Sequence, residues 1–123
     1  MIIKIDFQSD EAIYMQLRNQ IILGIAASML HEGDVLPPVR TLAGQVGINM
    51  HTVNKAYALL RQEGFVTMDR RRGAVIAVDA DKLEAIEETR ASLAPILAKA
   101  TCLGVSRSEI HELVDELISS WEE

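Results

Sequence analysis

Hydrophobic residues recur every three or four positions over most of the chain, which is the spacing of amphipathic helices. Isoleucine, leucine and methionine residues at this spacing between Ala12 and Leu30 predict one helix of about five turns. We expect Ser9 or Asp10 to cap the start of this helix and Gly33 to end it. The residues before it, MIIKIDF, predict a short strand or an extended arm.

A second, shorter helix is predicted over residues 39–46. Pro37 and Pro38 precede it, and proline suits the first turn of a helix because the N–H that it lacks would have no partner there. The apolar positions form a narrow stripe, as in a helix with one buried face. Gly47 is expected to end the helix.

A third helix should begin only a few residues later. Asn49 can cap it by accepting the backbone N–H of His51 or Thr52, and Gly64 is expected to end it. The residues that recur at helical spacing, and that we expect to be buried, are Val53, Ala56, Tyr57 and Leu60. The two short helices are therefore joined by a tight turn.

The pattern then changes to that of a β-hairpin. Two β-prone runs, FVTM and AVIAV, flank the loop sequence DRRRG. Gly73 can adopt the positive φ that such loops usually require. Helix, helix, tight turn, helix and two-stranded ribbon is the order of a winged helix-turn-helix domain, so the sequence predicts a mainly α protein.

The last part of the chain is again helical. One helix is predicted over 83–103, with Pro95 expected to kink or split it, and Gly104 to end it. Ser106 and Glu109 have the spacing of a capping box at the start of a further helix. That helix carries a continuous apolar stripe ending at Trp121. We expect two domains: 1–78 as the winged helix and 79–123 as a helical dimerisation tail.

Composition changes this picture in two ways. Apolar residues make up 49% of the chain and aromatic residues only 4%, as expected for a helical core of aliphatic side chains. The net charge of −6 hides a division: residues 36–78 carry six cations and two acids, and residues 79–123 carry four cations and eleven acids. A phosphate backbone responds to the local charge of +4, so a nucleic-acid surface is compatible with an acidic protein.

The sequence gives little support for a metalloprotein, an enzyme or a membrane protein. The histidines and the single cysteine, Cys102, are too scattered for a metal site, and no nucleophile and base or phosphate-binding loop predicts an enzyme or a cofactor. One cysteine also fits a reducing compartment. No apolar run is long enough to span a bilayer, and the opening residues are too quickly charged for a signal peptide, so we expect a cytoplasmic protein.

Polar residues gather at the start of the third helix, where a recognition helix would touch base edges. Asn49 and Asn54 can pair with adenine, His51 can bond a base edge, and Lys55 can reach guanine or phosphate. Thr52 can donate a hydrogen bond to phosphate. The arginine-rich hairpin tip would relieve its own charge repulsion against phosphate or a minor groove.

The segment LPPVRTLAGQVGINMHTVNKAYALLRQEGFV, followed by RRRG, resembles the DNA-binding domain of the GntR family of bacterial transcriptional regulators over about residues 9–78. The short helical tail is similar to that of the YtrA subfamily. The resemblance implies a homodimeric repressor on a palindromic operator, with the tail as dimer interface. Arg40 matches the family's DNA-contacting arginine. The chain departs from the family pattern at Pro38, at Met50 and Asn54, and at the hairpin tip.

The predicted sites follow from these arguments. The residues expected to contact double-stranded DNA are Arg40, Asn49, Met50, His51, Thr52, Asn54, Lys55, Arg70, Arg71, Arg72 and Gly73. The residues expected at the dimer interface are Leu93, Leu97, Ile110, Leu113, Val114, Leu117, Ile118 and Trp121. Two alternatives stay open: a winged helix that binds a protein partner instead of specific DNA, and a regulator that also binds a small-molecule effector at the dimer interface. The operator, any effector and the regulated genes cannot be read from the sequence.

Overall fold

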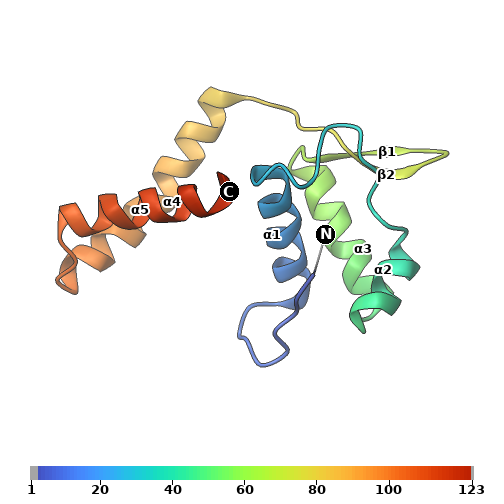
Figure 1. Ribbon diagram of the computed structural model, residues 1–123, viewed down its shortest axis with the longest axis horizontal. Helices are drawn as coiled ribbons and strands as arrows, with labels where there is room; N and C mark the ends of the chain where they lie inside the picture. Colours follow the sequence, from blue (N-terminus) through green and yellow to red (C-terminus); the bar gives the residue numbers. More distant parts are fainter. Residues whose placement is uncertain (1–2, 123) are drawn as a thin grey trace. The chain divides into compact units, whose positions relative to one another are not determined.

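The structure is a computed structural model that describes residues 3–122. The chain divides into two compact units, Met1–Asp79 and Ala80–Glu123. The first contains α1 (Ile13–Ala26), α2 (Val39–Val46), α3 (Met50–Gln62) and the antiparallel strands β1 (Val66–Asp69) and β2 (Gly73–Ile76). The second contains α4 (Lys82–Cys102) and α5 (Arg107–Glu122). The mainly α winged helix-turn-helix fold is confirmed (Figure 1).

The core of the first unit lies between α1, α2, α3 and the hairpin. Its fully covered side chains come from positions that helical or strand periodicity places inward, and Val53, Ala56 and Leu60 have no exposed surface at all. The predicted buried face of α3 is therefore confirmed. The buried apolar residues of the described chain are Leu17, Ile21, Leu36, Leu42, Ala43, Val53, Ala56, Tyr57, Leu60, Val66, Ala74, Val75 and Ile76.

The first helix differs from its prediction at both ends. It starts at Ile13 with no side-chain cap, while the Ser9 hydroxyl accepts the N–H of Glu11 in the preceding turn. It ends at Ala26 because the chain leaves it through Ser28, which has a φ of 59°. The N–H of Met29 then bonds to the carbonyl of Gly24 at 2.9 Å, which is a Schellman closure with serine where glycine is usual.

Gly24 explains why the chain turns there. A Cβ on Gly24 would lie 3.1 Å from Cδ1 of Leu30, so the missing side chain lets the returning chain pack on α1. Gly33, the predicted stop, instead lies in the next loop. The prediction of a five-turn helix is therefore wrong, and the physical reason is a packing contact that periodicity does not reveal.

The opening residues form an extended arm along α1 and are not assigned as a strand; Met1 and Ile2 lie outside the described residues. Two glutamine side chains one turn apart hold the arm. The Gln16 amide accepts from the N–H of Asp6 at 2.9 Å and donates to its carbonyl at 3.0 Å. Gln20 makes the same two kinds of bond with the backbone of Lys4. The buried Gln16 is thus a fully satisfied polar group.

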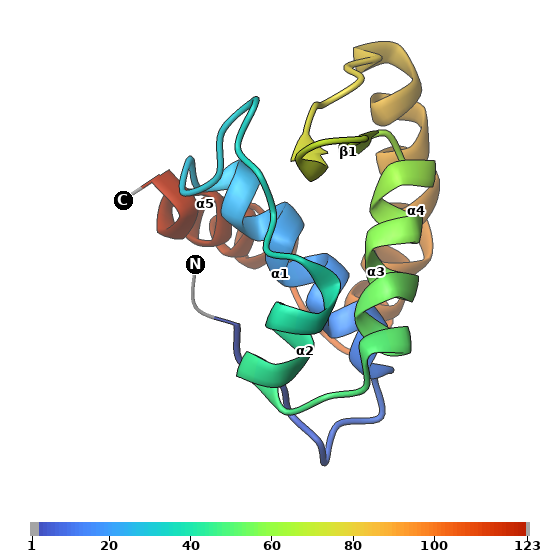
Figure 2. The same ribbon diagram turned by 90° about the vertical axis from the view of Figure 1, so that its right-hand side faces the viewer.

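The predicted hairpin is confirmed, and a residue from the loop before α2 also pairs with β2. Val66 pairs with Ile76 and Asp69 with Gly73, whose φ is 86°. On the other edge of β2, Val35 forms an isolated antiparallel bridge with Val75. This bridge ties the hairpin to the loop before α2. Figure 2 shows the ribbon from the side on which the hairpin lies.

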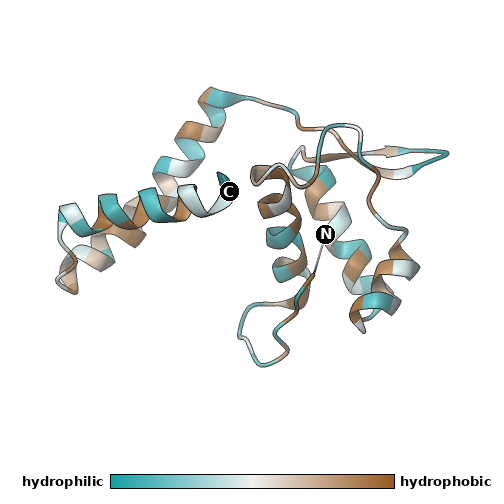
Figure 3. Ribbon diagram, viewed as in Figure 1, coloured by the Kyte–Doolittle hydropathy of each residue, from teal (hydrophilic) through white to brown (hydrophobic). Residues whose placement is uncertain are grey.

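The second unit is a pair of helices. The capping box is confirmed, since Ser106 Oγ accepts the N–H of Glu109 at 3.1 Å and Glu109 accepts that of Ser106 at 3.0 Å. The predicted split at Pro95 is not seen, because α4 runs unbroken through it. None of the described residues of α4 and α5 is buried, although Figure 3 shows hydrophobic residues on both.

Candidate nucleic-acid interface

The outer face of α3 presents the polar side chains that the sequence singled out. His51 and Asn54 are exposed, and neither side chain hydrogen-bonds another residue in the range 3–122. Met50 is exposed to 38%, and Thr52 is half-buried. The opposite face of α3 is packed in the core, so the helix is anchored on one side and open to a ligand on the other.

Asn49 caps α3 as predicted. Its side-chain Oδ1 accepts the N–H of His51 at 2.8 Å, which satisfies one of the donors at the start of the helix. Pairing with adenine would need the same amide oxygen to accept a base donor. The cap uses one of the two lone pairs of this oxygen, and a base contact by Asn49 stays a prediction.

Lys55 has an intramolecular partner. Its Nζ lies 4.1 Å from the centroid of the Tyr14 ring on α1, a distance that allows a cation–π contact. The contact links the recognition helix to α1. A phosphate or guanine contact would have to share the ammonium group with this ring or draw it away.

Tyr57 belongs to the core. Its hydroxyl donates to the carbonyl of Pro37 at 2.7 Å, and burial raises the pKa of Tyr57. The bond joins α3 to the residues just before α2, where Arg40 is exposed. The hydroxyl proton is therefore already used within the domain.

The hairpin tip is ordered by Asp69. Its Oδ1 accepts the N–H groups of Arg71 at 2.8 Å and Arg72 at 3.0 Å, and its Oδ2 lies 3.4 Å from the guanidinium of Arg72. The backbone hydrogen bond from Arg71 is the main reason that the pKa of Asp69 is lowered. Arg70 and Arg71 form no ion pair with any described residue. The tip therefore holds exposed cations on a defined turn.

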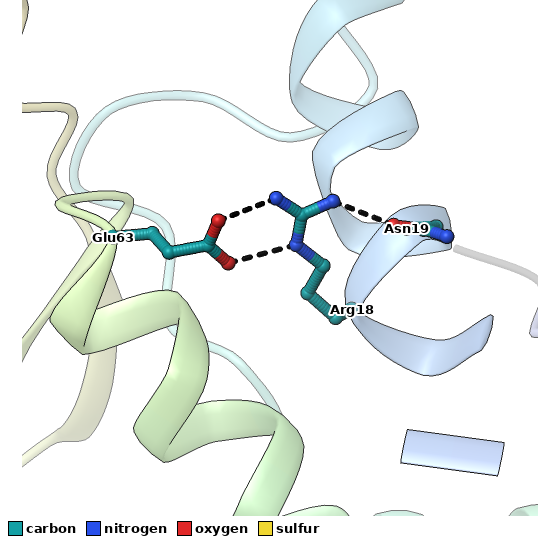
Figure 4. Close-up of polar contacts among 3 residues, drawn as sticks. All are labelled: Arg18, Asn19 and Glu63. Atoms are coloured by element: carbon teal, nitrogen blue, oxygen red, sulfur yellow. Dashed lines mark hydrogen bonds and ion pairs between the residues drawn. The ribbon is translucent and has the colours of Figure 1, made fainter. Parts of the chain in front are cut away.

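The other acid of this region is also paired. Glu63, at the end of α3, forms a bidentate ion pair with Arg18 of α1 (Figure 4). The Oε1 atom lies 2.8 Å from Nε of Arg18, and Oε2 lies 2.5 Å from Nη2. The hydrogen bond to Glu63 raises the pKa of Arg18. Arg18 also donates to Asn19 Oδ1 at 2.6 Å.

This pairing strengthens the basic character of the surface. Of the two acids between residues 36 and 78, Glu63 is neutralised by Arg18 and Asp69 by the hairpin itself. Arg18 and Glu63 are 45 positions apart. No local sequence rule joins residues so far apart, so sequence reasoning missed this pair.

None of the predicted dimer-interface residues is buried in the single chain. Leu93 of α4 and the α5 residues Leu113, Val114, Leu117 and Ile118 are between 39% and 53% exposed. Leu97, Ile110 and Trp121 are half-buried. The tail thus carries apolar surface that its own two helices do not cover.

Metal-binding clusters and membrane-spanning helices are both absent from residues 3–122. No three histidine, cysteine, aspartate or glutamate side chains there are grouped closely enough to bind a metal ion. No helix within this range has both the length and the hydrophobicity of a bilayer-spanning segment.

Comparison with known proteins agrees with this architecture. Residues 9–76 match the family described as bacterial regulatory proteins, gntR family. The transcriptional repressor YtrA of Bacillus subtilis is 33% identical over 121 residues, covering 94% of this chain and 91% of that protein.

Two solved structures resemble the chain. A transcriptional antiterminator from Listeria monocytogenes EGD-e superposes with a TM-score of 0.90 at 30% identity, over 100% of this chain and 94% of that one. YtrA from Sulfolobus acidocaldarius, a GntR-family transcription factor, has a TM-score of 0.64 at 41% identity, over 76% of this chain and 99% of that one. The chain belongs to the GntR family of bacterial transcriptional regulators, and its winged helix-turn-helix is the family's DNA-binding domain.

Proposed function

We propose that this protein is a homodimeric transcriptional repressor that binds a palindromic operator. The observation that carries the proposal is the surface formed by α3 and the hairpin. It holds the exposed polar side chains that we predict to contact bases and the exposed arginines of the hairpin, and both neighbouring acids are neutralised. Such a surface matches the phosphate backbone in charge and a base edge in hydrogen-bonding capacity.

The docking geometry follows from the fold. The start of α3, with His51 and Asn54, would enter a major groove, which is about 12 Å wide and admits one helix. The hairpin tip at Arg70 and Arg71 would lie against the adjacent backbone or minor groove. Arg40, exposed at the start of α2, would hold a phosphate and fix the register.

The tail would join two copies. The exposed stripe of α5 needs a partner, and a second copy of the α4–α5 pair offers the same apolar surface in return, as a two-fold interface requires. Together the four helices would cover what two leave open. Two half-sites about one helical turn, roughly 34 Å, apart would then be read by the two copies of α3.

The proposal that the protein represses transcription rests on its similarity to a named repressor. The Bacillus subtilis relative is named a transcriptional repressor, and it is similar over nearly the whole of this chain. A dimer bound across an operator can block access to it by occupancy alone. A small-molecule effector that alters the angle between the two subunits would change the distance between the two copies of α3. DNA binding would weaken, because that distance would no longer match the spacing of the half-sites.

The deciding experiment is selection of bound sequences from random duplex DNA, followed by titration of the selected site at several salt concentrations. A specific repressor should enrich a palindrome and lose affinity steeply with salt, because phosphate contacts release counterions. A protein-interaction module should enrich no sequence. Failure to enrich any sequence, together with a flat salt dependence, would refute the proposal.

The hairpin provides a sharper version of this test. Replacing Arg70, Arg71 and Arg72 with alanine should weaken binding to every duplex and reduce the salt slope by about 0.9 for each phosphate that the hairpin no longer neutralises. A matched control replaces Lys82, Arg90 and Arg107 of the tail helices with alanine and removes the same charge. If both triple variants change binding equally, only net charge matters and the hairpin does not touch the DNA.

A further inference from the structure

A groove of about 410 Å³ lies between α3 and the hairpin. Side chains of α3 from Asn54 to Gln62 line one side, and Met68 of β1 lines the other. Tyr57 also borders it, and Val39 contributes from the first turn of α2. The α3 residues that line it with Tyr57 are Asn54, Ala58, Arg61 and Gln62.

Three of these residues share one face of α3. Asn54, Ala58 and Arg61 are spaced i, i+4 and i+7, which brings them into line along the helix over roughly 10 Å. Asn54 lies on the half of the helix predicted to read bases, and Arg61 lies in its last turn. The groove therefore continues the base-reading face toward the hairpin.

The shape of duplex DNA says what should lie in this groove. If α3 enters a major groove and the hairpin tip reaches the neighbouring minor groove, one sugar-phosphate backbone separates the two. That backbone must pass between α3 and the hairpin. This step rests on the proposed function, since it assumes that both elements face the same duplex.

The charges in the groove suit an anionic strand. Arg61 is exposed and forms no ion pair within residues 3–122. Glu63, two residues later, is held by Arg18 of α1, so its carboxylate is neutralised. The Tyr57 hydroxyl already donates to Pro37, which leaves Arg61 as the strong donor among the groove's side chains.

We propose that this groove seats the DNA backbone strand that separates the two grooves, with Arg61 binding one of its phosphates and Ala58 leaving room for the strand. Arg61 is then a DNA-binding residue beyond those predicted from the sequence. Ala58 is exposed, and its methyl group is the smallest side chain that still keeps the helix regular. A larger side chain at this position would stand in the path of the strand.

The charge part is tested with Arg61→Gln, measured as affinity for the selected operator and for unrelated duplex DNA across a salt series. The expected result is a loss of about tenfold on both DNAs and a salt slope lower by about 0.9. Arg61→Lys should keep most of the slope. Arg90→Gln on α4 is the matched control and should leave the slope unchanged.

The steric part is tested with Ala58→Met, which adds volume without changing charge or weakening the helix. We expect weaker binding to all DNA with an unchanged melting temperature, whereas Ala91→Met on the exposed surface of α4 should bind like the unmodified protein. If Arg61→Gln and Ala58→Met both bind normally while the triple hairpin variant is impaired, the groove proposal is overturned and DNA binding stands. If the unmodified protein shows no salt-dependent binding, the proposed function itself fails.

Discussion

The polar side chains at the start of α3 fall into two groups according to their partners. Asn49 closes the helix end, and Lys55 lies over Tyr14, so both already stabilise the fold. The side chains of His51 and Asn54 bond no other residue within 3–122. A side chain without an internal partner is free to satisfy a base edge at no cost to the domain, so these two are the stronger candidates for sequence reading.

This division predicts different outcomes for single substitutions. His51→Ala and Asn54→Ala should each relax preference at one or two operator positions, at a cost of about 1–3 kcal/mol for each good base contact. Asn49→Ala should instead lower the free energy of unfolding by about 1 kcal/mol through loss of the cap. Binding to operators with single base-pair changes and urea denaturation would measure the two effects. Unaltered base preference in both His51→Ala and Asn54→Ala would place the reading surface elsewhere.

The ion pair between Arg18 and Glu63 predicts an effect on DNA binding that is larger than its effect on stability. Arg18→Gln leaves the Glu63 carboxylate without its counter-ion at the end of α3, where it repels phosphate. We expect weaker binding to all duplexes, with less than about 1 kcal/mol lost from the free energy of unfolding because the pair is partly exposed.

The double variant Arg18→Gln with Glu63→Gln separates the two possible causes. It removes the repulsive carboxylate along with its partner, so affinity should return to that of the unmodified protein. Fluorescence anisotropy titrations at fixed salt would measure this. If the double variant binds as weakly as Arg18→Gln, then Arg18 itself contacts the DNA and the electrostatic explanation is wrong.

At the scale of elements, the residues at which helices end determine the lengths of the helices. The φ values of Gly47 and Gly64, 78° and 85°, are those of residues that stop helices, and α2 and α3 end beside them as predicted. Ser28 takes the corresponding place after α1 without glycine's freedom, held by the packing of Leu30 on Gly24. Local chemistry thus sets most ends, and packing sets one.

The capping box of α5 predicts a pH-dependent contribution to stability. The hydrogen bond from the N–H of Ser106 is the main reason that the pKa of Glu109 is lowered. A lowered pKa means that the Glu109 carboxylate stabilises the folded chain at pH values above its ordinary 4.5, and that this contribution is lost as the pH falls through the lowered pKa. Helix α5 should therefore lose its reciprocal cap in acid.

Ser106→Ala should reduce the stability of the tail helices by about 0.5–2 kcal/mol at pH 7, because Ser106 Oγ no longer accepts the N–H of Glu109. Most of the acid dependence should remain, because alanine keeps the backbone N–H that donates to Glu109. Circular dichroism at pH 7 and pH 3 would follow the helix content. Ser119→Ala, on the exposed surface of α5, is the matched control and should not destabilise the protein. Equal effects of the two variants would show that the cap contributes nothing.

For the whole molecule, the distribution of buried residues matters most. Every fully buried apolar side chain of the described chain lies at or before Ile76, and none lies on α4 or α5. The first unit therefore has a core of its own. The tail has apolar surface without a core, which is the pattern expected of a segment that folds against a second copy of itself.

Truncation after Asp79 should accordingly leave a folded monomer. We expect it to bind one half-site weakly and to lose the preference for a palindrome, because two half-sites no longer act together. Sedimentation equilibrium of the full-length and shortened chains would measure the change. A full-length chain that stays monomeric at micromolar concentration, or a shortened one that remains dimeric, would move the interface away from the tail.

A single substitution can test the same interface with the chain intact. Leu117→Glu would place a charge in the middle of the predicted contact and should shift the dimer toward monomer. Glu116→Ala, at the exposed neighbouring position, should leave the association constant nearly unchanged. Equal behaviour of the two variants would argue against a contact through the stripe of α5.

The sequence by itself determined those features that depend on residues within a turn or two of each other. Helical period indicated the buried face of α3, and the residue types at Asn49 and Ser106 predicted caps that the structure contains. The hairpin and the positive φ of Gly73 were equally accessible, because turn chemistry is local. The winged-helix fold follows from this order of elements. Which residues touch DNA stays a prediction from the same local pattern.

Only the tertiary structure decided the features that join distant parts of the chain. The pairing of Arg18 with Glu63 depends on how α1 packs on α3, and the place of Lys55 depends on the same packing. The early end of α1 depends on Leu30 returning to Gly24, a contact that overrides the apolar repeat. Propensity and periodicity act along the chain, whereas these contacts arise when side chains compete for space and partners in three dimensions.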